Sequence, residues 1–173
     1  MSKTQLKKEL QGFTKEQLQE IILAAYDSSA KAKEYFEFFI NPDANALMEK
    51  GLDIVQKELK RTKWGECKAR ISIIRKVIKE YAAFGVGAEN HAKMVLTVLA
   101  MVIHKSTYYH LSEPLSKGML GFASEYVTIA ANNGFLEQAI CNVGQVTDEY
   151  ARPRIAAEIH RQIDSTVQKL KTL

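Results

Sequence analysis

The chain has 173 residues, of which 46% are hydrophobic and 25% are charged, and its formal net charge is +4. This length suits one domain, and this composition supports a hydrophobic core, which excludes disorder over most of the chain. Prolines and glycines are few, and β-branched residues do not alternate with polar ones over any long window. We therefore expect one all-α domain over residues 1–173 rather than a fold built on a sheet.

The distribution of apolar residues and cysteines predicts a cytoplasmic protein that does not enter a membrane. The N-terminus runs directly into an amphipathic pattern, without the apolar segment of a secretory signal. The most apolar stretch, Met94 to Ile103, is well short of the roughly 20 residues that span a bilayer, so we expect a buried core helix there. Cys67 and Cys141 belong to no paired motif, and both fall in segments with helical apolar spacing, where a free cysteine acts as a small hydrophobe.

Four helices are expected in the first third of the chain. The first covers residues 3–10, and the second begins at Thr14, which forms a capping box with Gln17. The third covers residues 30–39, where aromatic side chains share one face that either packs into a core or lines a partner groove. Asn41-Pro42 then predicts the start of a fourth helix that continues to about Thr62.

Longer helices with short turns are expected from Glu66 onward. The apolar spacing predicts helices over residues 66–84, 88–109, 115–131, 135–150 and 155–170. Because short turns force neighbouring helices to be antiparallel, the pattern predicts a row of antiparallel helical hairpins, with about eight helices in all. The hairpins form either a bundle or a short solenoid-like array. No repeat of fixed period is present that would favour the solenoid.

Three features of the sequence together resemble a bacterial family of small all-helical proteins with no assigned function. They are the lysine-rich first helix followed by the helix that Thr14 caps, the aromatic segment Tyr35-Phe36-Glu37-Phe38-Phe39 closed by Asn41-Pro42-Asp43, and the helix from Ala69-Arg70 to Phe84 with outward lysines. The resemblance covers most of the chain. It implies an all-α fold and supplies no catalytic residues.

Basic residues are concentrated in one segment, residues 57–79. Between Lys57 and Glu80 the chain has nine basic and three acidic residues, a balance of +6 against +4 for the whole chain. Lys68, Ser72, Arg75, Lys76 and Lys79 would form one stripe on the expected helix of residues 66–84. With Trp64 nearby, the stripe could bind nucleic-acid phosphates and stack a base, or bind an acidic protein. The ordinary interpretation is the solvated outer face of an amphipathic helix. The residues of this candidate binding site are Lys68, Arg75, Lys76, Lys79 and Trp64.

Other residue types give weaker signals. No two of the four histidines are spaced to share a helix face, so we expect no metal site, and no motif for a cofactor is present. Gly118 and Gly121 lie inside an expected helix, where each costs about 1 kcal/mol relative to alanine. We expect a neighbouring helix to pack closely against them.

The sequence leaves three hypotheses about function. The first is a non-enzymatic cytoplasmic interaction or scaffold module that binds a protein partner or its own copies. The alternative is a protein that binds nucleic acid or another polyanion through residues 57–79. The second alternative is an enzyme whose catalytic groups converge from distant helices, although no catalytic motif is present in the sequence.

Overall fold

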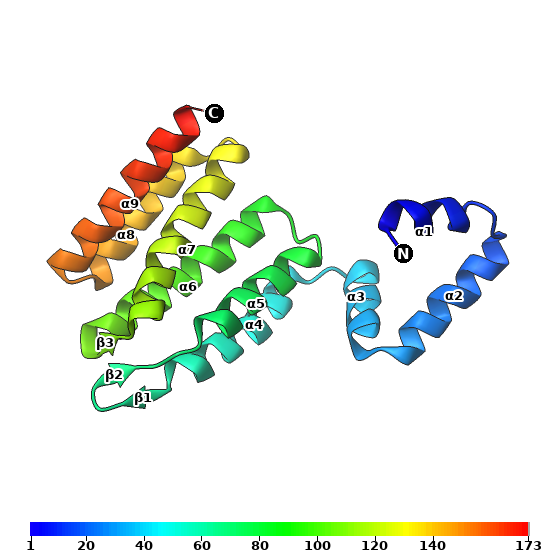
Figure 1. The fold of residues 1–173 in the computed structure, drawn as a ribbon, viewed down its shortest axis with the longest axis horizontal. Helices are drawn as coiled ribbons and strands as arrows, with labels where there is room; N and C mark the ends of the chain where they lie inside the picture. Colours follow the sequence, from blue (N-terminus) through cyan, green and yellow to red (C-terminus); the bar gives the residue numbers. More distant parts are fainter. Residues whose placement is uncertain (173) are drawn as a thin grey trace. The chain divides into compact units, whose positions relative to one another are not determined.

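The computed structural model describes residues 1–172 and has an all-α fold, as the sequence predicts. Nine helices and one small three-stranded sheet are found in the described residues. The chain divides into two compact units, Met1–Asp43 and Ala44–Leu173 (Figure 1). Leu173 lies outside the described residues. That residues 1–173 form one domain stays a prediction.

The first unit consists of three short helices: α1 (Lys3–Leu10), α2 (Lys15–Ser28) and α3 (Ala30–Ile40). The predicted capping box of α2 is confirmed: the amide of Gln17 donates to Thr14 Oγ1 at 3.3 Å, and the amide of Thr14 donates to Gln17 Oε1 at 2.9 Å. These bonds satisfy amides that lack a partner inside the helix. No described residue of these three helices is buried, so the aromatic face of α3 is not part of a closed core within this unit.

The second unit contains six helices in three consecutive pairs. The pairs are α4 (Ala44–Leu59) with α5 (Ile71–Ala83), α6 (Ala88–Tyr108) with α7 (Glu113–Asn132), and α8 (Leu136–Tyr150) with α9 (Pro153–Lys171). In each pair the two helices pack against each other, and α6 and α7 lie between the other two pairs (Figure 1). This arrangement agrees with the row of helical hairpins expected from the short turns.

The core of the second unit is centred on α6 and α7. The apolar stretch predicted to be a core helix lies in α6, where Met94, Val98 and Leu99 have no exposed surface. Facing them, Leu115 and Phe122 of α7 are also fully buried. None of the helices within residues 1–172 is long and apolar enough to cross a membrane.

A β-hairpin and a third short strand replace the expected start of the helix over residues 66–84. Strand β1 (Thr62–Lys63) pairs antiparallel with β2 (Glu66–Cys67), and β2 pairs in parallel with β3 (His110–Leu111). The prediction of a helix from Glu66 was therefore wrong, since α5 begins only at Ile71. The physical reason is a contact far along the chain: the backbone of β3 supplies hydrogen bonds to β2, which the local apolar spacing cannot reveal.

Two further expectations are corrected by the structure. Asn41 ends α3 instead of starting α4, because its amide donates to the carbonyl of Glu37 at 3.0 Å, and α4 begins only at Ala44. A residue that precedes proline is disfavoured in helical backbone geometry, and Asn41 accordingly has a φ of −129° and a ψ of 81°. Cys67 lies in β2 instead of a helix, although it is buried as expected.

Candidate nucleic-acid interface

The hairpin presents the chain's one tryptophan at its tip. Trp64 and Gly65 connect β1 and β2 with φ angles of 57° and 77°, the left-handed geometry of a tight two-residue hairpin turn. Glycine adopts this geometry freely, but a bulky residue there costs roughly 1–3 kcal/mol. The Trp64 side chain is 92% exposed, so no packing inside the protein offsets that cost. An exposed, strained tryptophan is a candidate contact residue for a ligand.

The outer face of the hairpin is basic. Residues paired across the strands share a face, and Cys67 is buried, so the pair Thr62–Cys67 faces the protein and the pair Lys63–Glu66 faces outward. Lys68 lies two residues beyond Glu66 on the same face, and its Nζ is 3.2 Å from Glu66 Oε2. Glu66 therefore neutralises part of the charge of Lys68, whereas no ion pair within the described residues involves Lys63.

Only part of the predicted basic stripe lies on a helix, because the hairpin occupies the segment before α5. Ser72, Arg75, Lys76 and Lys79 are spaced along one face of α5, and together with Glu80 and Ala83 they line an open hollow of about 420 Å³. Arg75, Lys76 and Lys79 are exposed. Lys68 lies outside this helix, so its predicted place in the stripe was wrong.

Arg75 packs against α7, where the lack of a side chain at Gly121 leaves room for its guanidinium. Its guanidinium carbon lies 5.7 Å from the centroid of the Phe122 ring, within cation–π range. A Cβ atom added to Gly121 would lie 2.6 Å from Arg75 Nη2, so only glycine leaves room for the guanidinium in this position. The close approach expected at Gly121 is confirmed, and its partner is Arg75. At Gly118 an added Cβ would lie 2.3 Å from Ile71 Cδ1, which confirms close packing between α5 and α7.

Arg70, the remaining basic residue between the hairpin and α5, has a structural role. Its guanidinium Nε donates to Glu58 Oε2 at 3.0 Å, and its backbone amide donates to the same oxygen at 3.3 Å. These hydrogen bonds lower the pKa of the Glu58 carboxyl group. Glu58 belongs to α4 and is 7% exposed, so the pair closes the base of the hairpin loop.

A second exposed aromatic side chain lies beside the hairpin, at the end of α6. The amide of His110 in β3 donates to the carbonyl of Gly65 at 3.1 Å, which brings the segment before β3 next to the hairpin turn. Tyr108 of this segment is 68% exposed, and its ring meets that of His104 edge-to-face at a centroid distance of 5.4 Å. Sequence reasoning missed Tyr108. The run Tyr108-Tyr109-His110 after an apolar helix was the available signal.

Cationic groups also lie near Tyr108. Lys105 Nζ is 4.1 Å from the centroid of the Tyr109 ring, and the guanidinium of Arg152 donates to the carbonyl of Thr107. We call the hairpin with Lys63, Trp64 and Lys68, together with Tyr108, Lys105 and Arg152, the Trp64 end of the second unit. It therefore combines aromatic rings with positive charge. Together with the α5 hollow, this end contains all five of the predicted site residues, in two groups: Trp64 with Lys68, and Arg75 with Lys76 and Lys79.

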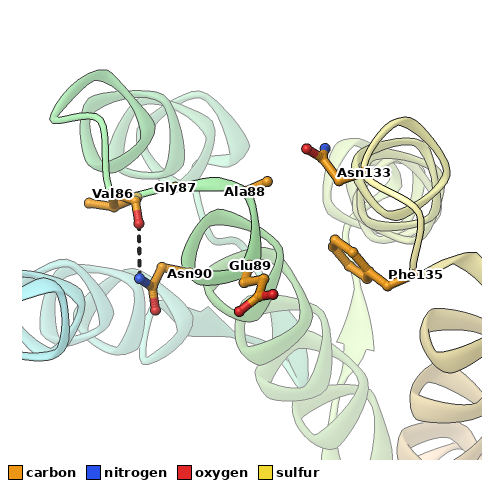
Figure 2. A pocket seen from close by; sticks show the side chains of 7 residues that line it. All are labelled: Val86, Gly87, Ala88, Glu89, Asn90, Asn133 and Phe135. Atoms are coloured by element: carbon orange, nitrogen blue, oxygen red, sulfur yellow. Dashed lines mark hydrogen bonds between the residues drawn. The ribbon is translucent and has the colours of Figure 1, made fainter.

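Another hollow of about 410 Å³ lies at the start of α6 (Figure 2). It is lined by Val86, Gly87, Ala88, Glu89, Asn90, Asn133 and Phe135. The side-chain amide of Asn90 donates to the carbonyl of Val86 at 2.9 Å, as the dashed line in Figure 2 shows, so this amide is already engaged. Among these lining residues, Glu89 is the one with an ionisable side chain. The lining therefore offers neither a pair of acid–base groups nor a basic surface.

The histidines do not gather into a site. Within residues 1–172, no group of three histidine, cysteine, aspartate or glutamate side chains could hold a metal ion. His104 packs against the rings of Tyr108 and Tyr150, and His160 Nε2 lies 3.2 Å from Thr147 Oγ1.

A comparison with known families decides where the chain belongs. A family profile described as "Family of unknown function (DUF6155)" matches residues 1–166. The chain belongs to this family. The resemblance inferred from the first helices, the aromatic segment and the helix from Ala69-Arg70 to Phe84 is thereby confirmed, while the bacterial range of the family stays a prediction. No match was found among curated proteins or among solved structures. The DUF6155 family description assigns no activity, so a proposal about function depends on the surfaces described above.

Proposed function

We propose that the protein is a non-enzymatic binding module whose second unit binds nucleic acid through the basic side chains of residues 57–79. The observation that carries the proposal is the exposed face of α5, where Arg75, Lys76 and Lys79 line one hollow. Phosphate groups bind such clusters mainly by Coulomb attraction and by releasing condensed counterions. Arg75 is preorganised for this role by its position against Phe122 and Gly121.

The distribution of ion pairs supports a surface with unsatisfied positive charge. Glu58 pairs with Arg61 and Arg70, and Glu66 pairs with Lys68. No ion pair within the described residues engages the remaining basic residues of the segment: Lys57, Lys60, Lys63, Arg75, Lys76 and Lys79. A polyanion would supply the counter-charge that the fold itself does not provide.

The test is an anisotropy titration of labelled 20-nucleotide single and double strands at low salt, repeated at increasing salt. We expect non-specific dissociation constants of roughly 10⁻⁴ to 10⁻⁶ M at physiological salt and tighter binding at low salt. The double substitution Lys76→Glu/Lys79→Glu should weaken binding at least about tenfold and make the salt dependence shallower.

The matched control is Lys169→Glu/Lys171→Glu, which makes the same change in net charge on exposed residues near the end of α9. It should weaken binding much less than the α5 variant does. Absence of binding to either nucleic acid at low salt, or equal weakening by both variants, would contradict the proposal.

Self-association through the first unit is a second candidate function, favoured by its exposed apolar side chains. Leu23 of α2 is 62% exposed, and Phe39 and Ile40 of α3 are 73% and 72% exposed. Contiguous exposed apolar patches commonly mark protein interfaces, and Phe39 and Ile40 are neighbours at the end of α3. Light scattering over a range of concentrations should then report a multiple of 19.5 kDa, and Phe39→Lys/Ile40→Lys should return the monomer mass. A monomer mass at every concentration would exclude this candidate.

The proposed location is the cytoplasm, where a reducing environment keeps cysteines free. Cys67 and Cys141 are both free thiols, and Cys141 is exposed. Cell fractionation followed by immunoblotting would test this location, and recovery in an extracellular or periplasmic fraction would contradict it.

A further inference from the structure

The Trp64 end carries two exposed aromatic rings, those of Trp64 and Tyr108. They indicate which form of nucleic acid the protein binds. The turn of the hairpin and the end of α6 are joined by the hydrogen bond from the His110 amide to the Gly65 carbonyl. Trp64 directly precedes Gly65, and Tyr108 lies two residues before His110, so this bond brings the backbone segments that carry the two rings together. Their exposed fractions, 92% and 68%, leave the rings available to a ligand.

We infer that the Trp64 end binds single-stranded nucleic acid by stacking unpaired bases on Trp64 and Tyr108, an inference that rests on the proposed function. In a duplex, the faces of the bases are covered by neighbouring base pairs, whereas in a single strand they are free to stack on aromatic side chains. Cations lie next to both residues along the chain: Lys63 directly precedes Trp64, and Lys105 lies over the ring of Tyr109, the residue after Tyr108. They supply contacts to the phosphates that separate the stacked bases.

The turn fixes the backbone of Trp64, whereas the ring of Tyr108 is held by packing against other rings. The left-handed turn fixes the backbone of Trp64, since both Trp64 and Gly65 have positive φ angles. Tyr108 packs edge-to-face on His104, which in turn meets the ring of Tyr150 edge-to-face at a centroid distance of 5.5 Å. The positioned ring of Tyr108 loses less side-chain freedom when a base stacks on it, which favours binding.

A membrane surface is the competing ligand for an exposed tryptophan beside lysines. Membrane-binding tips usually combine aromatic with aliphatic side chains that enter the apolar layer. Among the described residues, the large exposed hydrophobic side chains beside the Gly65–His110 bond are Trp64 and Tyr108, and both are aromatic with a polar group. Because no aliphatic side chain is among these exposed residues, we assign base stacking to them, and binding to a lipid surface is a separate outcome of the test.

The fluorescence of Trp64 tests the inference directly, because the chain has one tryptophan. The full-length protein is titrated at low salt with oligo(dT) of 20 nucleotides, with a duplex of equal length, with polyphosphate, and with vesicles of phosphatidylglycerol. We expect oligo(dT) to quench the fluorescence and to bind more tightly than the duplex. Polyphosphate has no bases, so it should bind without quenching.

Substitutions separate stacking from charge. Trp64→Ala should lower the affinity for oligo(dT) roughly 5- to 150-fold, the fold-change that corresponds to loss of one stacked base, and should leave polyphosphate binding unchanged. Trp64→Asn, which suits the positive φ of the turn, should lower the affinity equally and so exclude a disturbed hairpin as the cause. Tyr108→Ala should also weaken oligo(dT) binding. Phe13→Ala, which removes an exposed ring of the first unit, is the matched control and should have no effect.

The outcomes distinguish this inference from the proposed function. Binding of oligo(dT) and duplex with equal affinity and without quenching would overturn the stacking inference and leave the charge-based proposal standing. A blue shift with vesicles and no response to oligo(dT) would assign the Trp64 end to a lipid surface and overturn the inference. Failure to bind any of the polyanions would remove both.

Discussion

Glu58 accepts hydrogen bonds from both the backbone amide and the guanidinium of Arg70, and this pair joins the last turn of α4 to the start of α5. The distances are 3.3 Å from the amide and 3.0 Å from Nε to Glu58 Oε2. The chain between the two residues contains the whole β-hairpin. The carboxylate therefore does the work of a cap for α5, since the N-cap residue Arg70 offers no side-chain cap bond.

This pair predicts a pH dependence of stability. The hydrogen bonds from Arg70 lower the pKa of Glu58 below its ordinary value of 4.5. A lowered pKa in the folded state means that the contribution is present above about pH 4.5 and is lost as the pH falls through the folded-state pKa. Urea denaturation should show Glu58→Gln less stable than the parent chain at pH 7, with the difference shrinking toward pH 3.

The control for this prediction is Glu113→Gln, which removes an ion pair with Lys117 whose side chains are 78% and 74% exposed. Solvent screens such a pair, so its loss should change stability little at any pH. A Glu58 variant as stable as the parent at pH 7 would show that the Arg70 hydrogen bonds add nothing to stability.

Substitution by alanine should have different effects on stability at the two glycines of α7, Gly118 and Gly121. In Gly118→Ala the new methyl group meets the side chain of Ile71, a branched residue with little freedom to move, so we expect a loss of about 1–3 kcal/mol. Ile71→Val removes Cδ1, the Ile71 atom nearest to the new methyl group. This substitution should therefore restore part of the loss in the double variant. The free energy of unfolding in urea measures both effects.

Gly121→Ala should leave the fold intact and displace Arg75. The atom in its way is Nη2, the far end of a flexible side chain, and alanine gains up to about 1 kcal/mol in helix propensity. We expect unchanged or higher stability together with weaker polyanion binding, because Arg75 leaves its position over Phe122. Unaltered binding in the anisotropy titration would show that the position of Arg75 does not matter.

The left-handed backbone of Trp64 should lower the free energy of unfolding of the protein. Asparagine and glycine tolerate a φ of 57° better than tryptophan does, so Trp64→Asn and Trp64→Gly should raise the free energy of unfolding by roughly 1 kcal/mol or more. Thermal and urea denaturation would measure the gain. A lower stability would mean that the exposed ring stabilises the hairpin by a contact that outweighs the backbone strain.

The two cysteines should differ in reactivity. Cys141 is exposed on α8, whereas Cys67 has no exposed surface and its thiol donates to the carbonyl of Leu59 at 3.6 Å. A thiol reagent in native buffer should modify Cys141 promptly and reach Cys67 only when the second unit opens. Titration with and without denaturant, read by mass spectrometry, tests this. Rapid modification of both thiols would contradict the burial of β2.

The local sequence determined much of this protein. Apolar spacing identified most of the helices, the capping residue Thr14 marked the start of α2, and the apolar stretch in α6 identified the centre of the core, since these signals depend on neighbours within a few residues. The family was also indicated by local features, the first two helices and the aromatic segment. Basic residues were visible as a concentration of charge, but the stripe drawn through Lys68 assumed a continuous helix.

Only the tertiary structure decided how the candidate site is assembled. Residues 66–67 form a strand because β3, far along the chain, supplies the hydrogen bonds that a two-residue strand cannot supply alone. The same contact joins the end of α6, which carries Tyr108, to the hairpin turn that carries Trp64. Arg75 lies over Phe122 because Gly121, on another helix, leaves space for it. Such contacts join residues distant in sequence, and their energies depend on packing, which the spacing of residue types along one segment does not encode.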